Sequence, residues 1–256
     1  MQLIDIGVNL AHDSFDHDRV EVMDRARAAG VTGMVITGSC KASSHKARDL
    51  AREHPDSLAA TAGVHPHHAK DFTDADAGWI RDLAGDPRVK AVGECGLDFW
   101  ESRVDEKWQK QLFQEQLALA DNHRLPVIVH ARKALDDVIS LLRRQGRRGG
   151  VIHSFTSSLA LAEFCLDEGF MLGFNGIATF NRADNVREVI EATPVEQLLL
   201  ETDAPYLTPS PERNRARRNE PAFVKSVLLK VAEVRQTDPA TMAEITWQNT
   251  CRLYGL

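Results

Sequence analysis

Eight short apolar runs, separated by amphipathic segments, constrain the fold of this 256-residue chain more than any other feature. Each run is long enough for a β-strand and too short for a typical helix. Most show little alternation of apolar and polar residues, as is typical of parallel strands buried on both faces. The runs are Leu3–Leu10, Gly33–Gly38, Leu58–Val64, Val89–Leu97, Pro126–His130, Val151–Phe155, Met171–Asn175 and Leu198–Thr202.

Segments with helical periodicity fill most of the gaps between these runs. They are Val20–Ala29, Lys107–Asn122, Leu135–Arg144, Leu159–Glu168, Asn185–Ala192, Glu220–Arg235 and Thr241–Leu253. The repeated alternation predicts an α/β protein with a TIM-like (β/α)8 barrel, formed as a single domain over residues 1–256. An open doubly wound sheet is the alternative on pattern alone. The sequence contains neither GxGxxG nor GxxxxGK[ST], which argues against the nucleotide-binding form of that sheet.

Composition excludes several other classes of protein. The chain is 43% hydrophobic and 27% charged, which is ordinary for a globular protein and unlike a disordered one. We expect no signal peptide and no membrane span, because no window approaches about 18 consecutive apolar residues. The cysteines form no CxxC pair, so we expect reduced thiols in a cytoplasmic protein without structural zinc. They are Cys40, Cys95, Cys165 and Cys251.

The charge balance limits how the chain could contact nucleic acid. It has 31 Lys+Arg against 37 Asp+Glu, a formal net charge of −6. This argues against coating of nucleic acid by bulk charge, but it allows an enzyme that binds a few phosphates locally. Arginines concentrate after the last apolar run, where their guanidinium groups would suit phosphate oxygens or form a solvated loop. They are Arg213, Arg215, Arg217 and Arg218.

Imidazole and carboxylate groups stand at or just after the ends of five predicted strands. They are His65, Glu94, His130, His153 and Asp203. In a barrel the carboxyl ends of the strands meet at one mouth, where catalytic residues lie. Burying these groups without partners would be costly, and together they are suitable ligands for divalent cations. Glu201 is predicted to point to the opposite side of its strand from Thr202, so we interpret it as a structural ion-pair partner outside the site.

Several of these strand ends resemble the TatD family of metal-dependent deoxyribonucleases. One such segment would be weak evidence, but six in the family's order, spanning nearly the whole chain, are highly specific. The segments are Gly63–His67, Gly93–Asp98, Val129–Arg132, His153–Phe155, Glu201–Tyr206 and Arg218–Pro221.

The resemblance implies a phosphodiester hydrolase, with 3′→5′ exonuclease action on single-stranded DNA and, as a further class, RNA. It implies a site for one or two divalent ions. Glu94 would bridge the metals, and His130 and His153 would complete one metal position. Asp203 would bind the other ion and act as the base for the attacking water. His65 would bind or polarise the scissile phosphate.

Three further residues match the family's pattern after the last strand. The resemblance implies that Tyr206, Arg218 and Asn219 position the substrate. No membrane partner is expected. We expect a monomer, because one barrel can bury its own core.

The first predicted strand departs from the family. Most members begin with Asp-x-His-x-His, whereas this chain has Gly7 and Asn9 at the two histidine positions. Glycine offers no ligand and asparagine offers only an amide oxygen. We therefore expect a looser, oxygen-rich first metal position that favours Mg²⁺ or Mn²⁺ over tightly held Zn²⁺.

Two other functions remain open from the sequence. The same barrel could carry a different ester or amide hydrolysis, such as deacylation of D-aminoacyl-tRNA, because a fold does not choose its chemistry. A binding protein that has lost catalysis is the other alternative. Gly7 and Asn9 favour the binding protein, whereas the retained ligand types at the other strand ends count against it.

Overall fold

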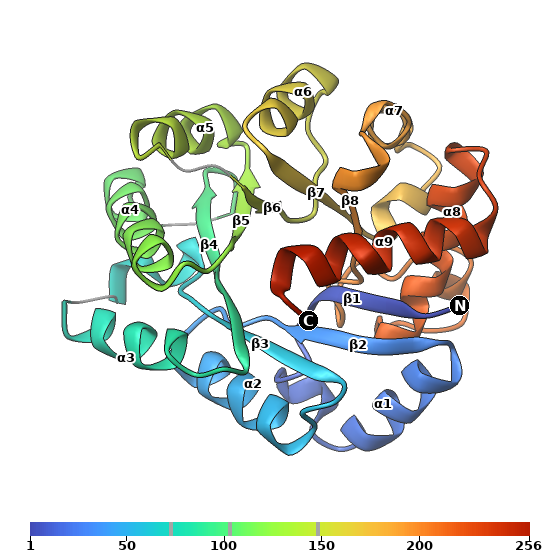
Figure 1. Cartoon of the computed structure of the whole chain (residues 1–256), viewed down its shortest axis with the longest axis horizontal. Helices are drawn as coiled ribbons and strands as arrows, with labels where there is room; N and C mark the ends of the chain where they lie inside the picture. The colour runs from blue at the N-terminus through green and yellow to red at the C-terminus, as the bar shows by residue number, and fades with distance from the viewer. Residues whose placement is uncertain (72–73, 102–103, 147–148) are drawn as a thin grey trace.

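All eight predicted strands are present, in one parallel sheet with strand order β1 to β8 (Figure 1). The computed structural model describes residues 1–71, 74–101, 104–146 and 149–256. Each predicted run overlaps an observed strand. The strands are β1 Leu3–Val8, β2 Val31–Ile36, β3 Leu58–Ala62, β4 Val89–Asp98, β5 Val127–Arg132, β6 Gly150–Ile152, β7 Phe170–Phe174 and β8 Leu198–Leu200.

The sheet is closed between its first and last strands by two backbone hydrogen bonds just beyond β8. The N–H of Asp203 donates to the carbonyl of Gly7 at 2.8 Å, and the N–H of Asn9 donates to that of Ala204 at 2.8 Å. Because each strand is followed by a crossover that returns it parallel to the last, the result is the expected TIM-like barrel. The closure also places Gly7 of β1, and Asn9 just beyond β1, beside Asp203.

Helices surround this sheet (Figure 1). The seven predicted helices are found with small shifts in their ends, and α2 and α3 are additional. The helices are α1 Arg19–Ala28, α2 Lys41–Glu53, α3 Asp74–Ala84, α4 Glu106–His123, α5 Leu135–Arg144, α6 Leu159–Asp167, α7 Asp184–Ala192, α8 Val224–Val234 and α9 Pro239–Tyr254. A 3₁₀ turn, Pro221–Phe223, precedes α8.

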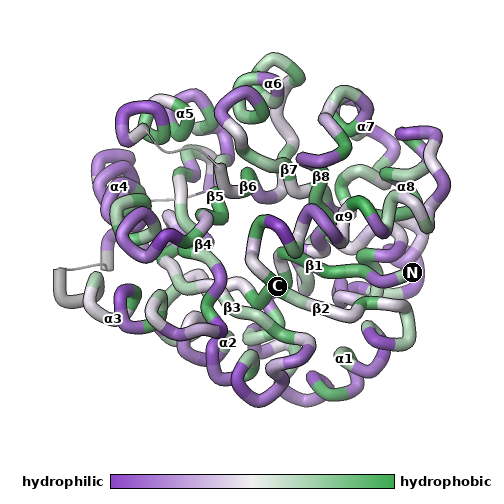
Figure 2. The backbone as a smooth tube through the Cα atoms, in the orientation of Figure 1, coloured by the Kyte–Doolittle hydropathy of each residue, from purple (hydrophilic) through white to green (hydrophobic). Residues whose placement is uncertain are grey.

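Two layers of apolar side chains hold the barrel together. The larger lies between the strands and the helices. Figure 2 shows hydrophobic residues along the strands, whereas hydrophobic and hydrophilic residues alternate along the helices. The smaller fills the barrel interior. It comprises Ile6, Val35, Ala59, Ala91, Ile128, Val151, Met171 and Leu199, with Tyr254.

Helix α9 closes the amino-terminal end of the barrel. Tyr254 packs against the inner layer, and the Asn249 amide donates to the carbonyl of Leu198 at the start of β8 at 2.9 Å. The carboxyl end of the barrel is therefore left for the site. Within the ranges described above, no helix is both long and apolar enough to cross a membrane.

Candidate metal centre

Glu94 is at the centre of a group of imidazoles at the carboxyl end of the barrel. It lies on β4, His130 lies on β5, His65 follows β3 and His153 follows β6. The glutamate Oε1 is 2.9 Å from Nδ1 of His130, 3.5 Å from Nε2 of His153 and 3.6 Å from Nε2 of His65. Ligand atoms of His65, Glu94 and His130 all lie within 4.8 Å of one another, an arrangement that could hold a metal ion.

The charges of this cluster favour an anionic glutamate. Burial opposes ionisation of Glu94, but the charges of His153 and His65 and the bond to His130 hold its pKa well below its usual range. Burial also opposes protonation of His130, yet its bonds to Asp98 and Glu94 raise its pKa to about 9. Burial lowers the pKa of His65 to about 3, so this imidazole is neutral near pH 7.

Asp203 faces the same cluster from the turn after β8. Burial raises its pKa to about 7, against the opposing charge of His153. Its Oδ1 accepts a hydrogen bond from Nδ2 of Asn9 at 3.2 Å. Asn9 therefore acts here as a donor to Asp203 through its amide nitrogen.

Glu201 belongs to the site, although its strand position predicted a structural ion-pair partner outside it. It is fully buried and accepts hydrogen bonds from Nδ1 of His153 at 2.7 Å and from the N–H of Ser154 at 2.6 Å. These contacts fix the imidazole so that its Nε2 lies toward Glu94. No local sequence pattern marks Glu201 as a site residue. In the structure it fills the space left by Gly7, because a Cβ at position 7 would lie 2.7 Å from Oε2 of Glu201.

Asp98, at the end of β4, is a second residue missed as a site member, although its segment was noted. Its Oδ2 is 2.8 Å from Nε2 of His67 and 3.4 Å from Nε2 of His130. Its Oδ1 accepts the N–H groups of Trp100 and Glu101, each at 2.8 Å. Asp98 thus orients a histidine of the cluster and also fixes the backbone at Trp100 and Glu101.

The three residues expected to position substrate have different surroundings. Tyr206 is 54% exposed, and its hydroxyl is 3.3 Å from Nε2 of His12. The guanidinium of Arg218 is bound to Asp18, with Nη1 2.9 Å from Oδ1, and stacks over the ring of Phe15.

Asn219 is buried beneath the loop after β8. It donates to the carbonyls of Thr202 at 2.9 Å and Tyr206 at 2.5 Å. Asn219 therefore shapes this loop, while Tyr206 is the most exposed of the three predicted substrate contacts.

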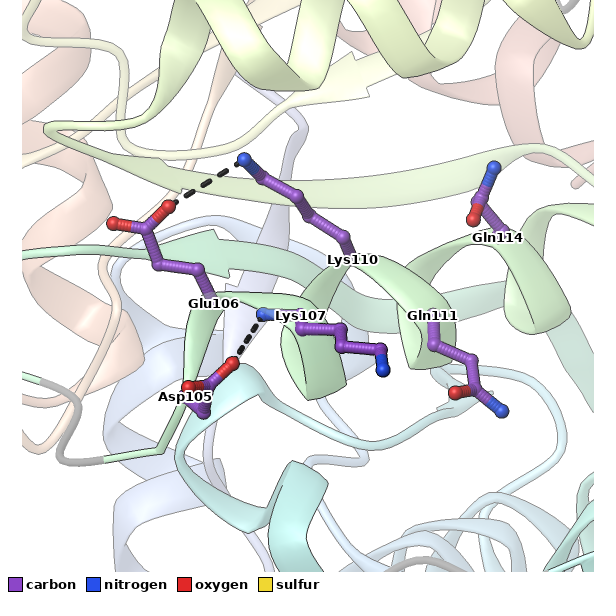
Figure 3. A pocket seen from close by; sticks show the side chains of 6 residues that line it. All are labelled: Asp105, Glu106, Lys107, Lys110, Gln111 and Gln114. Carbon is purple, nitrogen blue, oxygen red and sulfur yellow. Dashed lines mark hydrogen bonds and ion pairs between the residues drawn. The ribbon is translucent and has the colours of Figure 1, made fainter.

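A separate hollow lies along the start of α4 (Figure 3). Its lining is Asp105, Glu106, Lys107, Lys110, Gln111 and Gln114. Lys110 is held there by Glu106 at 3.4 Å and by Asp137 of α5 at 2.7 Å. The hollow shares no residue with the cluster around Glu94 and brings together no group of metal ligands among the described residues.

Comparisons with known proteins match the chain over almost all of its length. The model of a family described as TatD related DNase matches residues 4–255. A protein of Erwinia tasmaniensis named 3′-5′ ssDNA/RNA exonuclease TatD is 43% identical over 259 residues, covering 99% of this chain and 100% of its own. A Bacillus subtilis protein named uncharacterized metal-dependent hydrolase YabD is 37% identical over 256 residues, covering 99% of each chain.

Solved structures give the same picture of the fold. The crystal structure of YJJV, a TatD homologue from Escherichia coli, has a TM-score of 0.93 with 29% identity and covers 99% of this chain and 98% of its own. A phosphotriesterase homology protein from Escherichia coli has a TM-score of 0.70 with 11% identity, covering 99% of this chain and 98% of its own. The second likeness concerns the barrel alone.

Proposed function

The chain belongs to the TatD related DNase family, and on this premise we propose that it is a metal-dependent hydrolase that removes nucleotides from the 3′ ends of single-stranded DNA and RNA. The observation that carries this proposal is the convergence of three imidazoles on one carboxylate oxygen, Oε1 of Glu94. Such a donor set is costly to bury without a cation and suits a divalent ion.

We propose Glu94, His130, His153 and Asp203 as ligands, with His65 added to this set. The 3.6 Å approach of His65 to Glu94, and its place in the group of ligand atoms with Glu94 and His130, support a ligand role in addition to contact with the scissile phosphate. When bound, a divalent ion would neutralise phosphate charge and supply a nucleophile at neutral pH.

The protein's own groups then orient the reaction. Asp203 accepts the proton of the attacking water as general base. Its Oδ1 is held by Asn9, whereas among the described residues no hydrogen bond occupies Oδ2. Glu201 fixes His153, and Asp98 fixes His130, so two of the proposed ligands are positioned by buried carboxylates.

The proposed ion is Mg²⁺ or Mn²⁺ rather than tightly held Zn²⁺. Gly7 and Asn9 remove two imidazoles from the family's usual set, and Glu94 and Asp203 supply oxygen ligands, which these two ions favour. Titration of the metal-free protein tests this, because restoration of activity by Zn²⁺ alone would contradict it.

Three further properties belong to the proposal. Residues 1–256 act as one domain, the protein is a monomer, and it functions in the cytoplasm. The four cysteines lie far apart in the sequence and form no CxxC pair, which supports a reducing compartment.

Direction and substrate are tested together with end-labelled oligonucleotides. With Mg²⁺ or Mn²⁺, a 3′-labelled single strand should release label as mononucleotide at once, while a 5′-labelled strand should shorten stepwise. A chelator should stop both reactions. Release of amino acid from D-aminoacyl-tRNA without shortening of the oligonucleotides would instead identify a deacylase and overturn the proposal.

A further inference from the structure

An exposed tryptophan stands beside the candidate metal centre. Trp100 lies two residues beyond the end of β4 and is 64% exposed. The next aromatic residue toward the strand, Phe99, is partly buried and packs against the main core. The loop therefore buries one ring and presents the other to solvent at the carboxyl end of the barrel.

The backbone of this loop is fixed by the metal centre itself. The N–H of Trp100 donates to Oδ1 of Asp98 at 2.8 Å, and Oδ2 of the same carboxylate is 3.4 Å from Nε2 of His130. The N–H of Phe99 donates to the carbonyl of Arg132 at 3.0 Å. Asp98 thus links the backbone of Trp100 to the ring of His130. The backbone at Trp100 is therefore held in place without substrate.

Positive charge accompanies the exposed ring. Lys133 follows β5, and its Nζ lies 5.9 Å from the centre of the Trp100 ring. Among the described residues, Lys133 has no carboxylate partner, whereas its neighbour Arg132 is paired with Glu101 at 2.6 Å. A ring has two faces and the lysine lies over only one, so the ammonium group does not prevent stacking on the other.

Proteins that bind single-stranded nucleic acid combine these two features, an aromatic ring on which a base stacks and a cation for the backbone. We infer that Trp100 and Lys133 form a binding platform in which the indole stacks on a base beside the scissile phosphate and the ammonium contacts a backbone phosphate. This inference rests on the proposed nuclease function. It assigns a binding site to the base beside the scissile phosphate and to a backbone phosphate, which the metal centre does not contact.

The platform also gives a reason for preferring unpaired ends. A base within a duplex is already stacked between its neighbours, so it must be unpaired and unstacked before it can reach Trp100. A single strand presents its bases at lower cost. The platform also gives an anionic strand a local binding site on a chain whose overall net charge is −6.

Four variants test the platform: Trp100→Ala, Trp100→Phe, Lys133→Met and, as a matched control, Trp108→Ala. Trp108 is also an exposed tryptophan, at 52%, but it lies on α4. On a single-stranded oligonucleotide, Trp100→Ala should raise KM about five- to 150-fold with a smaller change in kcat, which corresponds to the loss of one stacked base. Trp100→Phe should recover much of this loss.

Lys133→Met keeps the apolar stem and removes the charge. It should reduce the salt dependence of binding, lowering the slope of log K against log salt by about 0.7, as expected for the loss of one contact to a single-stranded phosphate. Binding is measured by fluorescence anisotropy of a labelled oligonucleotide with chelator present, so this readout does not depend on hydrolysis.

An oligonucleotide with abasic sites at its last two 3′ positions separates stacking from general damage. On this substrate Trp100→Ala and wild type should have similar KM, because no base remains to stack. If Trp100→Ala and Trp108→Ala behave alike on the normal strand, the platform is wrong while the nuclease proposal stands. If wild type neither binds nor degrades single strands, the proposed function fails and the platform fails with it.

Discussion

Gly7 and Glu201 share one space at the mouth of the barrel, because a Cβ at position 7 would lie 2.7 Å from Oε2 of the glutamate. The carboxylate that fills this space accepts the Nδ1–H of His153 at 2.7 Å, and the other nitrogen of that ring lies 3.5 Å from Oε1 of Glu94. The glycine that replaces the family's usual histidine therefore gives room to the group that orients another proposed ligand.

Replacement of Gly7 by alanine should disturb this arrangement. The added methyl group must displace Glu201, and overpacking of this kind costs about 1–3 kcal/mol of folding stability. Metal affinity should fall along with it, as measured by calorimetric titration and thermal unfolding. Gly78→Ala in α3 is the matched control, since a Cβ there would meet nothing within 4 Å. Equal metal affinity in the two variants would contradict the shared-space interpretation.

Glu201→Gln should weaken metal binding while leaving the barrel folded. The amide keeps the size of the side chain but loses the negative charge that holds His153 in place. Removal of such a supporting partner typically costs about 10–100-fold in metal affinity. Calorimetry with Mn²⁺ measures this, and circular dichroism checks the fold. An unchanged dissociation constant would show that Glu201 has only a packing role.

Asp98→Asn should affect the metal centre and the Trp100 loop together. Asp98 contacts His67 and His130 with one oxygen and the loop N–H groups with the other. We expect kcat/KM on single-stranded DNA to fall by at least about tenfold. Proteolysis of the loop and metal titration are the paired measurements. A change in only one of the two would show that Asp98 does not couple them.

Asp5 should make stability depend on pH. Burial raises its pKa to about 7 from the ordinary value of 3.8, against hydrogen bonds from Thr202 and Gly7. The folded protein then keeps a proton that the unfolded chain releases, so the free energy of unfolding falls as pH rises from about 4 to about 7. The full effect is of the order of 4 kcal/mol, at about 1.4 kcal/mol per pKa unit.

Asp5→Asn is the variant that isolates this effect. The amide resembles the protonated acid, so its stability should fall less than that of wild type over this pH range. Urea unfolding at several pH values measures the difference, in which contributions from the other groups cancel. Parallel curves for the two proteins would show that Asp5 is not the titrating group.

Much of the fold follows from the sequence, because buried parallel strands require continuous apolar runs. Helix α2 was missed for a physical reason. Its buried side chains are Ser44, Ala47 and Ala51, so no large apolar residue marks the buried face of this helix in the sequence. The helix predicted over Glu220–Arg235 is divided, with a 3₁₀ turn at its proline and α8 beginning at Val224.

The cluster itself was accessible from the sequence because strand ends meet at one mouth of any such barrel. Its supporting carboxylates were not, because their roles depend on contacts between strands. Glu201, at the end of β8, contacts His153, at the end of β6. Asp98, at the end of β4, contacts His67, which follows β3. The binding of Arg218 to Asp18 is likewise a long-range contact that a local motif does not contain.

We propose above all that Glu94 organises a divalent metal centre that hydrolyses single-stranded nucleic acid from its 3′ end. The most direct test compares wild type with Glu94→Gln for Mn²⁺ binding and for release of label from a 3′-labelled single strand. We predict that the variant remains folded, loses metal affinity and slows by at least about 100-fold. Wild-type metal affinity and unchanged label release in Glu94→Gln would contradict the account.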